Sequence, residues 1–583
     1  MATNAELAGR FEEFADLLEA DGVDYKPRAY RRAAENIRAH PVPIADRVEA
    51  GDEDVLEEID GVGDAIASKI VEYVETGTIE ELEELRAELP IDVADITRIE
   101  GVGPKTAGKL YRELGIETLD DLEAAAENGE IQEVKGFGSK TEQNIRENLE
   151  FARQVGQRHL LGEARPLADD VLAYLESLEA VERCEVAGSI RRWRETIGDV
   201  DVLVGTDAGE EVIEAFVNWD SVDREIESGP EKASVRVGEI RVDLRVVVPE
   251  EFGSALQYFT GCKDHNVRLR NYAIDRGMKL NEYGAFDVSD LDDEASGQRV
   301  GDRVAGATEA GMYEALGLPW IPPELREDRG ELEAAERGAL PDLVEREEIR
   351  GDLHTHTEWS DGNTSIEAMV EAAEARGYDY YAVADHAEGP GIVGDVGLSD
   401  TEILEQVEAI REVDAASEVD VFAGIEANVD ADGEIGLSAE VIDALDLIVA
   451  SPHSGLSQDA ETATERLVRA VENPAVDVLG HPSGRLLNER SGLDFDATAL
   501  GEAAAEHDTA LEINANPRRL DLWGSAVQAA VEEGAPIAVN TDAHQPATLE
   551  YVRWGVHTAR RGWAEADDVI NTWDVDDLRA FLH

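Results

Sequence analysis

The sequence predicts a multidomain protein that joins an α+β part to an α/β part. At 583 residues the chain is too long for a single hydrophobic core. Amphipathic helical segments separated by glycine turns occupy residues 1–155, and helices mix with β-rich segments over 156–322. After residue 349, seven apolar strands alternate with amphipathic helices at intervals of about thirty residues. This last pattern predicts a closed parallel barrel, a distorted (β/α)7 barrel.

The net charge is strongly negative. There are 130 Asp and Glu residues against 52 Lys and Arg residues, which gives a formal net charge of −78. Such a surface repels nucleic-acid phosphates. However, the acidic residues are spread over the whole chain, and no lysine follows Lys279. We therefore interpret the charge as a halophilic adaptation to a cytoplasm near molar salt, where screening is nearly complete within roughly 3 Å.

The sequence argues against secretion and against a membrane partner. Cys184 and Cys262 are the two cysteines, too few for a disulfide framework or a cysteine-based zinc site. The N-terminus lacks the pattern of a signal peptide, and no apolar run reaches the length of about 18 residues expected of a membrane span. We expect a cytoplasmic protein.

Three glycine turns recur in the helical region, and each precedes a new helix. A single G-x-G is usually an ordinary turn between helices, but paired glycines also leave N–H groups free at a helix N-terminus, where an anion binds well. Three copies, two of them followed by lysine, favour contact with DNA backbone phosphates. The candidate DNA-binding residues are Gly61, Gly63, Gly101, Gly103, Lys105, Gly136, Gly138 and Lys140.

The most informative segment lies between residues 188 and 201. Asp199 and Asp201 alternate on an apolar strand, so both side chains point to the same face. The segment Gly188–Arg192, just ahead of them, pairs a glycine-serine turn with two arginines that suit phosphate groups. Asp243 lies in another predicted strand. Three carboxylates beside a phosphate cradle predict two-metal phosphoryl or nucleotidyl transfer.

Histidines and carboxylates follow the strands of the predicted barrel. The carboxyl ends of barrel strands converge on one face, and alternate residues of one strand point the same way. Neutral imidazole suits Zn²⁺ or Mn²⁺, and nine ligands suffice for three ions. The predicted metal ligands are His354, His356, Asp361, His386, Glu426, His453, His481, Asp542 and His544.

Residues 1–322 resemble family X DNA polymerases, of which the β-type gap-filling enzyme is the best known. The resemblance rests on AYRRAAENIRAHP, GVGPKTAGKLYRELGIETLDDL, GSIRRWRETIGDVDVLV, RVDLRVV and YFTGCKDHNVRLR. It implies a helix-hairpin-helix domain of the lyase-like type over 1–90, a helix-hairpin-helix DNA-binding subdomain over 91–155, a nucleotidyltransferase palm over 156–250 and a nucleotide-selection subdomain over 251–322.

The same resemblance assigns roles to individual residues. The three aspartates would hold two Mg²⁺ or Mn²⁺ ions, and Gly188, Ser189 and Arg192 would hold the β- and γ-phosphates of a dNTP. The other nucleotide-binding positions would be Tyr258, Phe259, Gly261, Asn266 and Arg270.

Lys69 aligns with the lysine that forms a Schiff base with 5′-deoxyribose phosphate in the β-type enzyme. That reaction needs an amine whose pKa is lowered. Ala65 and Arg31 stand where supporting lysines are expected. A 5′-deoxyribose phosphate or abasic-site lyase and an ordinary surface lysine both stay open.

Residues 349–583, which follow a charged helical linker over 323–348, resemble the PHP (polymerase and histidinol phosphatase) domain. All nine positions of that family's metal pattern are present. The resemblance implies a phosphoesterase with up to three Zn²⁺ or Mn²⁺ ions. In members fused to family X polymerases the expected activity is a 3′→5′ exonuclease, with abasic-site or 3′-phosphate cleavage as further alternatives.

Together these patterns predict a monomeric polymerase for base excision repair that binds gapped or nicked DNA and dNTPs and carries a fused exonuclease. Two alternatives stay open. In the first, the phosphoesterase is the main activity and the polymerase half serves as a DNA-docking module. In the second, the chain is a DNA-end scaffold and both sites are inactive.

Overall fold

The structure is a computed structural model that describes residues 4–23, 26–38, 44–49, 56, 59, 61–97, 99, 102–155, 158–290, 297–391 and 396–582. The chain folds into two compact units. One comprises Met1–Arg158 with Arg485–Ser491, and the other comprises His159–Gly484 with Gly492–His583. Every helix of the described residues is too short or too polar to span a bilayer.

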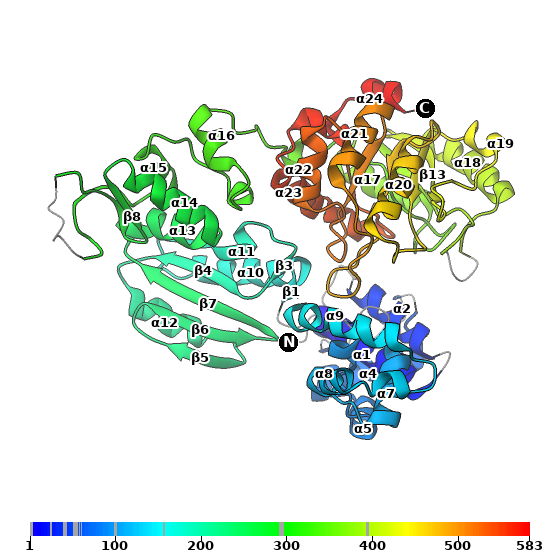
Figure 1. The fold of residues 1–583 in the computed structure, drawn as a ribbon, viewed down its shortest axis with the longest axis horizontal. Coiled ribbons are helices and arrows are strands. Elements are labelled where there is room, and N and C mark those ends of the chain that lie inside the picture. The colour runs from blue at the N-terminus through cyan, green and yellow to red at the C-terminus, as the bar shows by residue number, and fades with distance from the viewer. Residues whose placement is uncertain are drawn as a thin grey trace. The chain divides into compact units, whose positions relative to one another are not determined.

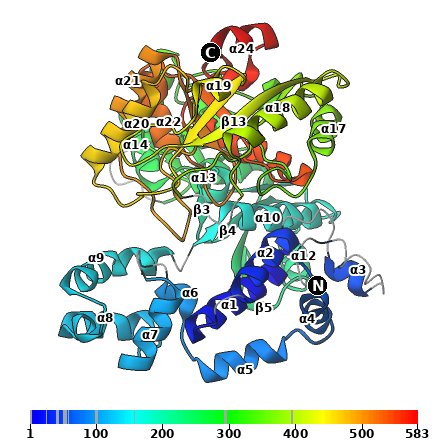
Figure 2. The same ribbon diagram turned by 90° about the vertical axis from the view of Figure 1, so that its right-hand side faces the viewer.

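The first unit is helical, as predicted. Its helices are α1 (Asn4–Asp21), α2 (Lys26–Arg38), α3 (Ile44–Glu49), α4 (Asp64–Thr76), α5 (Glu80–Glu88), α6 (Val93–Ile96), α7 (Pro104–Leu114), α8 (Leu119–Asn128) and α9 (Ser139–Val155). Helix α1 packs against α2 and α7 (Figure 2). Gly108 permits the second contact, because a Cβ there would lie 2.0 Å from the carbonyl oxygen of Ala20. Phe11, Phe14 and Leu110 are fully buried in the shared core.

The second unit begins with a five-stranded mixed sheet in the order β2-β4-β7-β6-β5 (Figure 1). Its strands are β2 (Arg183–Val186), β4 (Val200–Gly205), β5 (Arg224–Ser228), β6 (Lys232–Val237) and β7 (Ile240–Val247). Strands β4 and β7 are parallel, and the other pairs are antiparallel. Along β7 buried residues alternate with more exposed ones, because successive side chains point to opposite faces. The helices of this part are α10 (Leu161–Glu176), α11 (Gly188–Arg191) and α12 (Gly209–Val217), and a short ribbon pairs β1 (His159–Leu160) with β3 (Thr196–Ile197).

A smaller helical and β region follows the mixed sheet. It contains α13 (Phe252–Thr260), α14 (Lys263–Ile274), β8 (Met278–Asn281), β9 (Gly284–Asp287), β10 (Asp302–Ala305) and α15 (Glu309–Glu314). Where the sequence predicts a linker over 323–348, the structure has η4 (Pro323–Leu325), α16 (Glu331–Arg337) and η5 (Arg346–Glu348). The side chains of Glu324, Arg326 and Glu331 are buried, so this segment is packed against its neighbours rather than solvated.

Seven parallel strands form the predicted barrel in sequential order. They are β11 (Gly351–Asp352), β12 (Tyr380–Val383), β13 (Asp420–Asn428), β14 (Leu447–Ser451), β15 (Val478–Leu479), β16 (Ala510–Asn514) and β17 (Ile537–Asn540). A single bridge between Thr355 and Ala543 links the two ends of the sheet, which nearly closes the barrel. The predicted architecture is confirmed, because the strands β12, β14, β16 and β17 are fully buried and helices alternate with the strands in the chain. The helices between strands are α17 (Ile366–Arg376), α18 (Asp400–Asp414), α19 (Ala439–Ile442), α20 (Ala460–Val471), α21 (Ala497–His507) and α22 (Gly524–Glu532). Helices α23 (Val552–Arg561) and α24 (Val575–Phe581) follow the last strand.

Candidate active sites

Three carboxylates meet on two neighbouring interior strands of the mixed sheet. Asp201 on β4 is the register partner of Asp243 on β7, and Asp199 precedes β4 by one residue. Paired residues of neighbouring strands point to the same face, so one oxygen of each carboxylate lies within 4.8 Å of the others. The structure thus brings together the three aspartates that the sequence singled out.

The electrostatics of this triad fit a divalent cation. Burial and the charges of Asp199 and Asp243 raise the pKa of Asp201 to about 7. A cation bound between like charges reverses that effect and keeps all three carboxylates ionised. Oxygen donors are also the ligands that Mg²⁺ and Mn²⁺ prefer. On the outer side of the triad, Asp243 accepts a 2.7 Å hydrogen bond from Arg241 Nε.

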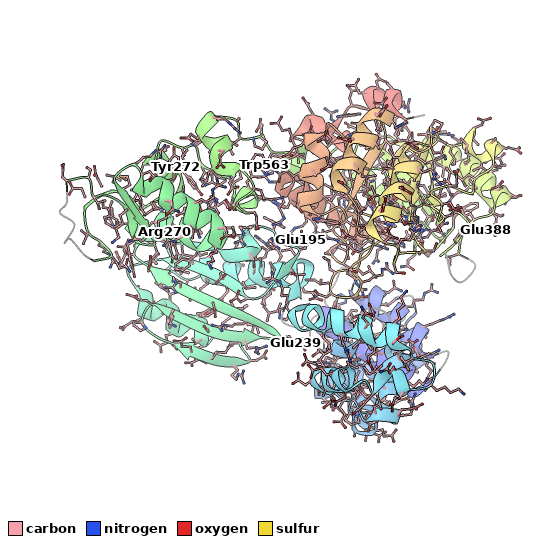
Figure 3. The ribbon with its side chains drawn as sticks, viewed as in Figure 1. Glu195, Glu239, Arg270, Tyr272, Glu388 and Trp563 are labelled. Atoms are coloured by element: carbon pink, nitrogen blue, oxygen red, sulfur yellow. The ribbon has the colours of Figure 1, made fainter. Side chains whose placement is uncertain are left out.

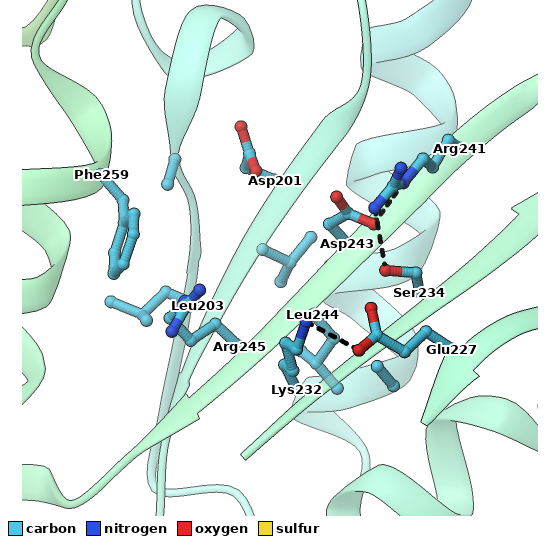
Figure 4. Close-up of a pocket in the computed structure, with 13 residues that line it drawn as sticks. Asp201, Leu203, Glu227, Lys232, Ser234, Arg241, Asp243, Leu244, Arg245 and Phe259 are labelled. Carbon is cyan, nitrogen blue, oxygen red and sulfur yellow. Dashed lines mark hydrogen bonds and ion pairs between the residues drawn. The ribbon is translucent and has the colours of Figure 1, made fainter. Parts of the chain in front are cut away.

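A cavity of about 260 Å³ lies against Asp201 and Asp243 (Figure 4). Lys232, Arg245 and Phe259 line other parts of it, and the Arg245 guanidinium lies 4.5 Å from the centroid of the Phe259 ring. Cations beside carboxylates suit a ligand that brings both phosphates and metal ions.

The predicted phosphate cradle lies directly beside the triad. Gly188 has φ +61°, and a Cβ there would lie 2.1 Å from Asp201 Oδ2, so only glycine allows this approach. The two arginines of the segment diverge. Arg191 pairs with Glu309 at 2.7 Å, whereas Arg192 donates from Nη1 to the carbonyl of Thr260 at 2.6 Å. Ser189 lies on α11 between Gly188 and these arginines.

The predicted nucleotide-binding residues Tyr258, Phe259, Gly261, Asn266 and Arg270 lie on α13, at its C-cap and on α14. The rings of Tyr258 and Phe259 meet edge to face at 5.0 Å. Asn266 Nδ2 donates to the carbonyls of Tyr258 and Gly261 at 2.8 and 3.0 Å, so Asn266 holds the end of α13. Arg270 is exposed on α14 (Figure 3).

All nine predicted ligands of the barrel gather at the carboxyl ends of its strands. Eight of them form three overlapping groups in which ligand atoms lie within 4.8 Å of one another, with His356 and His386 each shared by two groups. The ninth, His481, places Nε2 3.0 Å from Glu426 Oε1. Overlapping groups with shared members are what a cluster of several ions requires. The groups are His356, Asp361, His386 and His544; His354, His356 and Asp542; and His386, Glu426 and His453.

Unpaired polar atoms support a metal in this centre. His354 Nε2, both ring nitrogens of His356 and His481 Nδ1 are buried and make no hydrogen bond within the described part of the chain. A buried polar atom without a partner costs about 1–3 kcal/mol, and a metal ion removes that cost. The backbone is also strained at two ligands, with φ +53° at Asp542 and +24° at His481. The donor set therefore fits a metal cluster.

Sequence reasoning missed the residues that orient these ligands. Glu512 on β16 is fully buried and accepts from His354 Nδ1 and from the His481 amide, each at 2.7 Å. Asn428 Oδ1 lies 2.7 Å from His453 Nδ1. Such partners set which imidazole nitrogen faces the metal. The available signal was a glutamate between Leu511 and Ile513 in the strand ALEIN.

The glycine turns of the first unit precede helices as predicted. Gly61 and Gly136 have φ of +75° and +96°, and Gly63 and Gly103 cap α4 and α7. Gly138 immediately precedes α9. The side chains of Lys105 and Lys140 are exposed in the first turns of their helices. Gly101 lies outside the described residues.

The surroundings of Lys69 do not provide the lowered pKa that the lyase alternative requires. Its Nζ lies 2.7 Å from Glu81 Oε2 and 5.8 Å from the centroid of the Phe14 ring. Burial alone would lower the pKa of Lys69, but the hydrogen bond to Glu81 and the nearby Tyr30 raise it above its usual value. The amine is held as a cation, which is not the nucleophilic form.

Comparisons with known proteins agree with this geometry. Residues 255–327 match the DNA polymerase beta thumb, 2–79 a helix-hairpin-helix domain, 52–115 and 93–150 a SAM-like helix-hairpin-helix tandem, and 352–516 the PHP domain. The chain is 34% identical to the DNA polymerase/3′-5′ exonuclease PolX of Bacillus subtilis (strain 168), over 98% of both proteins.

Two further relatives each match one part of the chain. DNA polymerase lambda of Rattus norvegicus is 25% identical over 56% of each protein. The Probable phosphatase YcdX of Escherichia coli O81 (strain ED1a) is 33% identical over 34% of this chain and 80% of that protein. The full-length match and the order of the matched domains lead to one conclusion: the chain belongs to the family X DNA polymerases that carry a C-terminal PHP domain.

Proposed function

We propose that the chain is a DNA-directed DNA polymerase that fills short gaps during DNA repair and removes 3′-terminal nucleotides with its PHP domain. The observation that carries the proposal is the triad of Asp199, Asp201 and Asp243 beside the Gly188–Arg192 cradle. The name of the Bacillus subtilis relative, DNA polymerase/3′-5′ exonuclease PolX, supports both activities.

In nucleotide addition, the triad would hold two Mg²⁺ or Mn²⁺ ions, which supply Lewis acidity to the primer 3′-hydroxyl and to the leaving pyrophosphate. Ser189 and Arg192 bind the β- and γ-phosphates, and Gly188 lets the Asp201 carboxylate approach this segment closely. Tyr258 and Phe259 stand beside the sugar and exclude a 2′-hydroxyl. Gly261, Asn266 and Arg270 complete the nucleotide and template contacts.

In 3′-end removal, the nine barrel residues would hold up to three Zn²⁺ or Mn²⁺ ions, which supply an activated water and polarise the phosphodiester. Glu426 lies within 4 Å of five of the imidazoles, and the three shortest distances are 2.5 Å to His386 Nδ1, 3.0 Å to His481 Nε2 and 3.3 Å to His453 Nε2. Its central place keeps the ligands together, and Glu512 and Asn428 keep the rings oriented.

DNA binding completes the proposal. The glycine turns with Lys105 and Lys140 contact the backbone of gapped or nicked DNA. We assign the domains as 1–90, 91–155, 156–250, 251–322, 323–348 and 349–583, in a monomeric cytoplasmic protein. Lyase activity is not part of the proposal, because Glu81 holds Lys69 in its charged form.

The test is extension and 3′ degradation of a gapped duplex at high KCl with Mg²⁺ or Mn²⁺. We expect Asp201→Ala to abolish synthesis and keep 3′ degradation, and His356→Ala to do the reverse. Synthesis that survives Asp201→Ala would overturn the polymerase assignment. A wild type that only degrades would support the docking-module alternative, and a wild type that does neither would support the scaffold.

A further inference from the structure

A buried contact joins the PHP barrel to the predicted phosphate cradle. Arg561, the last residue of α23, is 4% exposed. Its Nη1 donates to the carbonyl oxygen of Arg192 at 2.8 Å and lies 3.3 Å from Glu327 Oε1. Its Nη2 lies 3.9 Å from Glu195 Oε1. A guanidinium from one domain thus contacts the main chain of the other domain at the residue expected to bind the triphosphate.

Glu327 closes the same network from the other side. Its Oε1 accepts from Arg192 Nε at 2.9 Å, and its Oε2 lies 3.3 Å from Arg194 Nη1. Burial alone would raise the pKa of Glu327, but the charges of Arg192 and Arg561 lower it. The glutamate is therefore an anion shared by arginines of both domains.

These contacts determine the pose of Arg192. Arg561 holds its carbonyl, Glu327 holds Nε, and the Thr260 carbonyl accepts from Nη1 at 2.6 Å. Of the side-chain nitrogens of Arg192, Nη2 takes no part in these three hydrogen bonds. An arginine held in this way loses less conformational entropy when it binds phosphate.

The neighbouring residue is clamped by the same helix. Trp193 has φ +53°, which a bulky residue rarely adopts without compensation. Its ring stacks on His557 of α23 at 3.4 Å between centroids and 8° between planes. The main chain at residues 192 and 193 is thus held twice by α23, through a hydrogen bond and through a stack.

We propose that Arg561 is a positioning residue for nucleotide addition, through which the PHP barrel holds Arg192 ready for the β- and γ-phosphates of a nucleoside triphosphate. The inference rests on the proposed polymerase function. It predicts that a residue of the nuclease domain sets the dNTP affinity of the polymerase site.

The experiment measures gap filling with the full chain and compares wild type with Arg561→Gln. We expect KM for dNTP to rise about tenfold and kcat to stay within about twofold. Exonuclease activity should stay at the wild-type level, because Arg561 contacts no metal ligand. The matched control is Arg560→Gln. Arg560 is the adjacent residue of α23, but it pairs with Glu324 and Glu345 rather than with Arg192.

The outcomes separate the inference from the function on which it rests. A wild type that does not fill gaps overturns the proposed function. If the wild type fills gaps and Arg561→Gln has the wild-type KM, the inference is wrong. An equal rise of KM in Arg560→Gln also overturns it, because general loosening of the interface would then explain the effect.

Two further variants keep the inference testable if Arg561→Gln does not fold. Arg561→Lys retains a donor for the Arg192 carbonyl but loses the fork to Glu327, and we expect KM to rise about threefold. If Arg561→Gln does not fold, the test rests on Arg561→Lys. The inference fails if this variant is folded and active as an exonuclease but has the wild-type KM. The double variant Glu327→Gln/Arg561→Gln should raise KM by less than the product of the two single effects.

Discussion

The two candidate metal centres of this chain differ in ligand chemistry and in burial. The triad on the mixed sheet offers three carboxylates, all partly exposed, beside an open cavity. The barrel offers six imidazoles and three carboxylates, and His354, His356 and Glu426 are completely buried there. Three oxygen ligands would leave at least half of the positions of a magnesium ion to water and substrate phosphates. Nine ligands, some with buried ring nitrogens that make no hydrogen bond within the described residues, would hold ions without substrate. We therefore predict that synthesis depends on ions that arrive with the nucleotide, whereas degradation depends on resident ions.

The largest expected effect comes from removing one charge of the triad. Asp243→Asn should lower the rate of synthesis by about a thousandfold, because a metal site supplies several kcal/mol of transition-state stabilisation. The 3′ degradation of the same DNA should not change. Primer extension and exonuclease assays on one preparation check this. A loss of both activities would show that the centres are not independent.

The second prediction concerns metal retention. After dialysis into metal-free buffer, wild type should keep more than one ion per chain, and His356→Ala should keep fewer, because His356 belongs to two of the overlapping groups. Asp243→Asn should retain as much metal as wild type. Elemental analysis measures both. Equal retention by wild type and His356→Ala would contradict the idea of resident ions.

A smaller effect on exonuclease activity is expected when Glu512, which orients the predicted metal ligand His354, is changed. Glu512→Gln leaves His354 Nδ1 with a weaker partner and should lower exonuclease activity 10- to 100-fold. Added Zn²⁺ or Mn²⁺ should restore part of the activity, and synthesis should stay at the wild-type level. Full activity without added metal would show that Glu512 does not orient the ligand.

The smallest expected effect is on the stability of the fold, and it should affect the polymerase and exonuclease activities equally. Glu324→Gln removes a buried carboxylate that accepts from Arg560 Nε at 2.8 Å and lies 3.0 Å from His557 Nδ1. We expect the free energy of unfolding to fall by about 2 kcal/mol and Tm to fall by about 4 °C. At raised temperature both activities should decline together.

The stability difference between wild type and Glu324→Gln should depend on pH through the ionisation of Glu324. Burial alone would raise its pKa, but the hydrogen bond to His557 and the charge of Arg560 lower it to about 2, from an ordinary value of 4.5. A lowered pKa stabilises the fold above the ordinary value and ceases to do so as the pH falls toward 2. The Tm difference should therefore be constant from pH 8 to about pH 6 and shrink below about pH 5. A difference that does not shrink would contradict this origin.

Much of both sites could be predicted from the chain because the signals are local. The alternation of Asp199 and Asp201 requires only the two-residue period of a strand, and the barrel ligands follow apolar segments of strand length. Asp243 lies in another predicted strand, and the register of β4 and β7 places it opposite Asp201.

The features that were missed depend on contacts between distant segments. The sequence leaves open whether Lys69 is a lyase nucleophile or a surface lysine, and only the fold shows that α5 places Glu81 against it. Glu512 lies 158 residues from the histidine it orients.

The sequence by itself determined the fold class, the order of the domains and the candidate ligands, because strand and helix periods and short motifs act over a few residues. Only the tertiary structure decided which charges neutralise one another in the interior. Arg192 and Arg561 are 369 residues apart in the chain, yet they share Glu327, because burying such a guanidinium requires an acceptor from whichever segment packs against it.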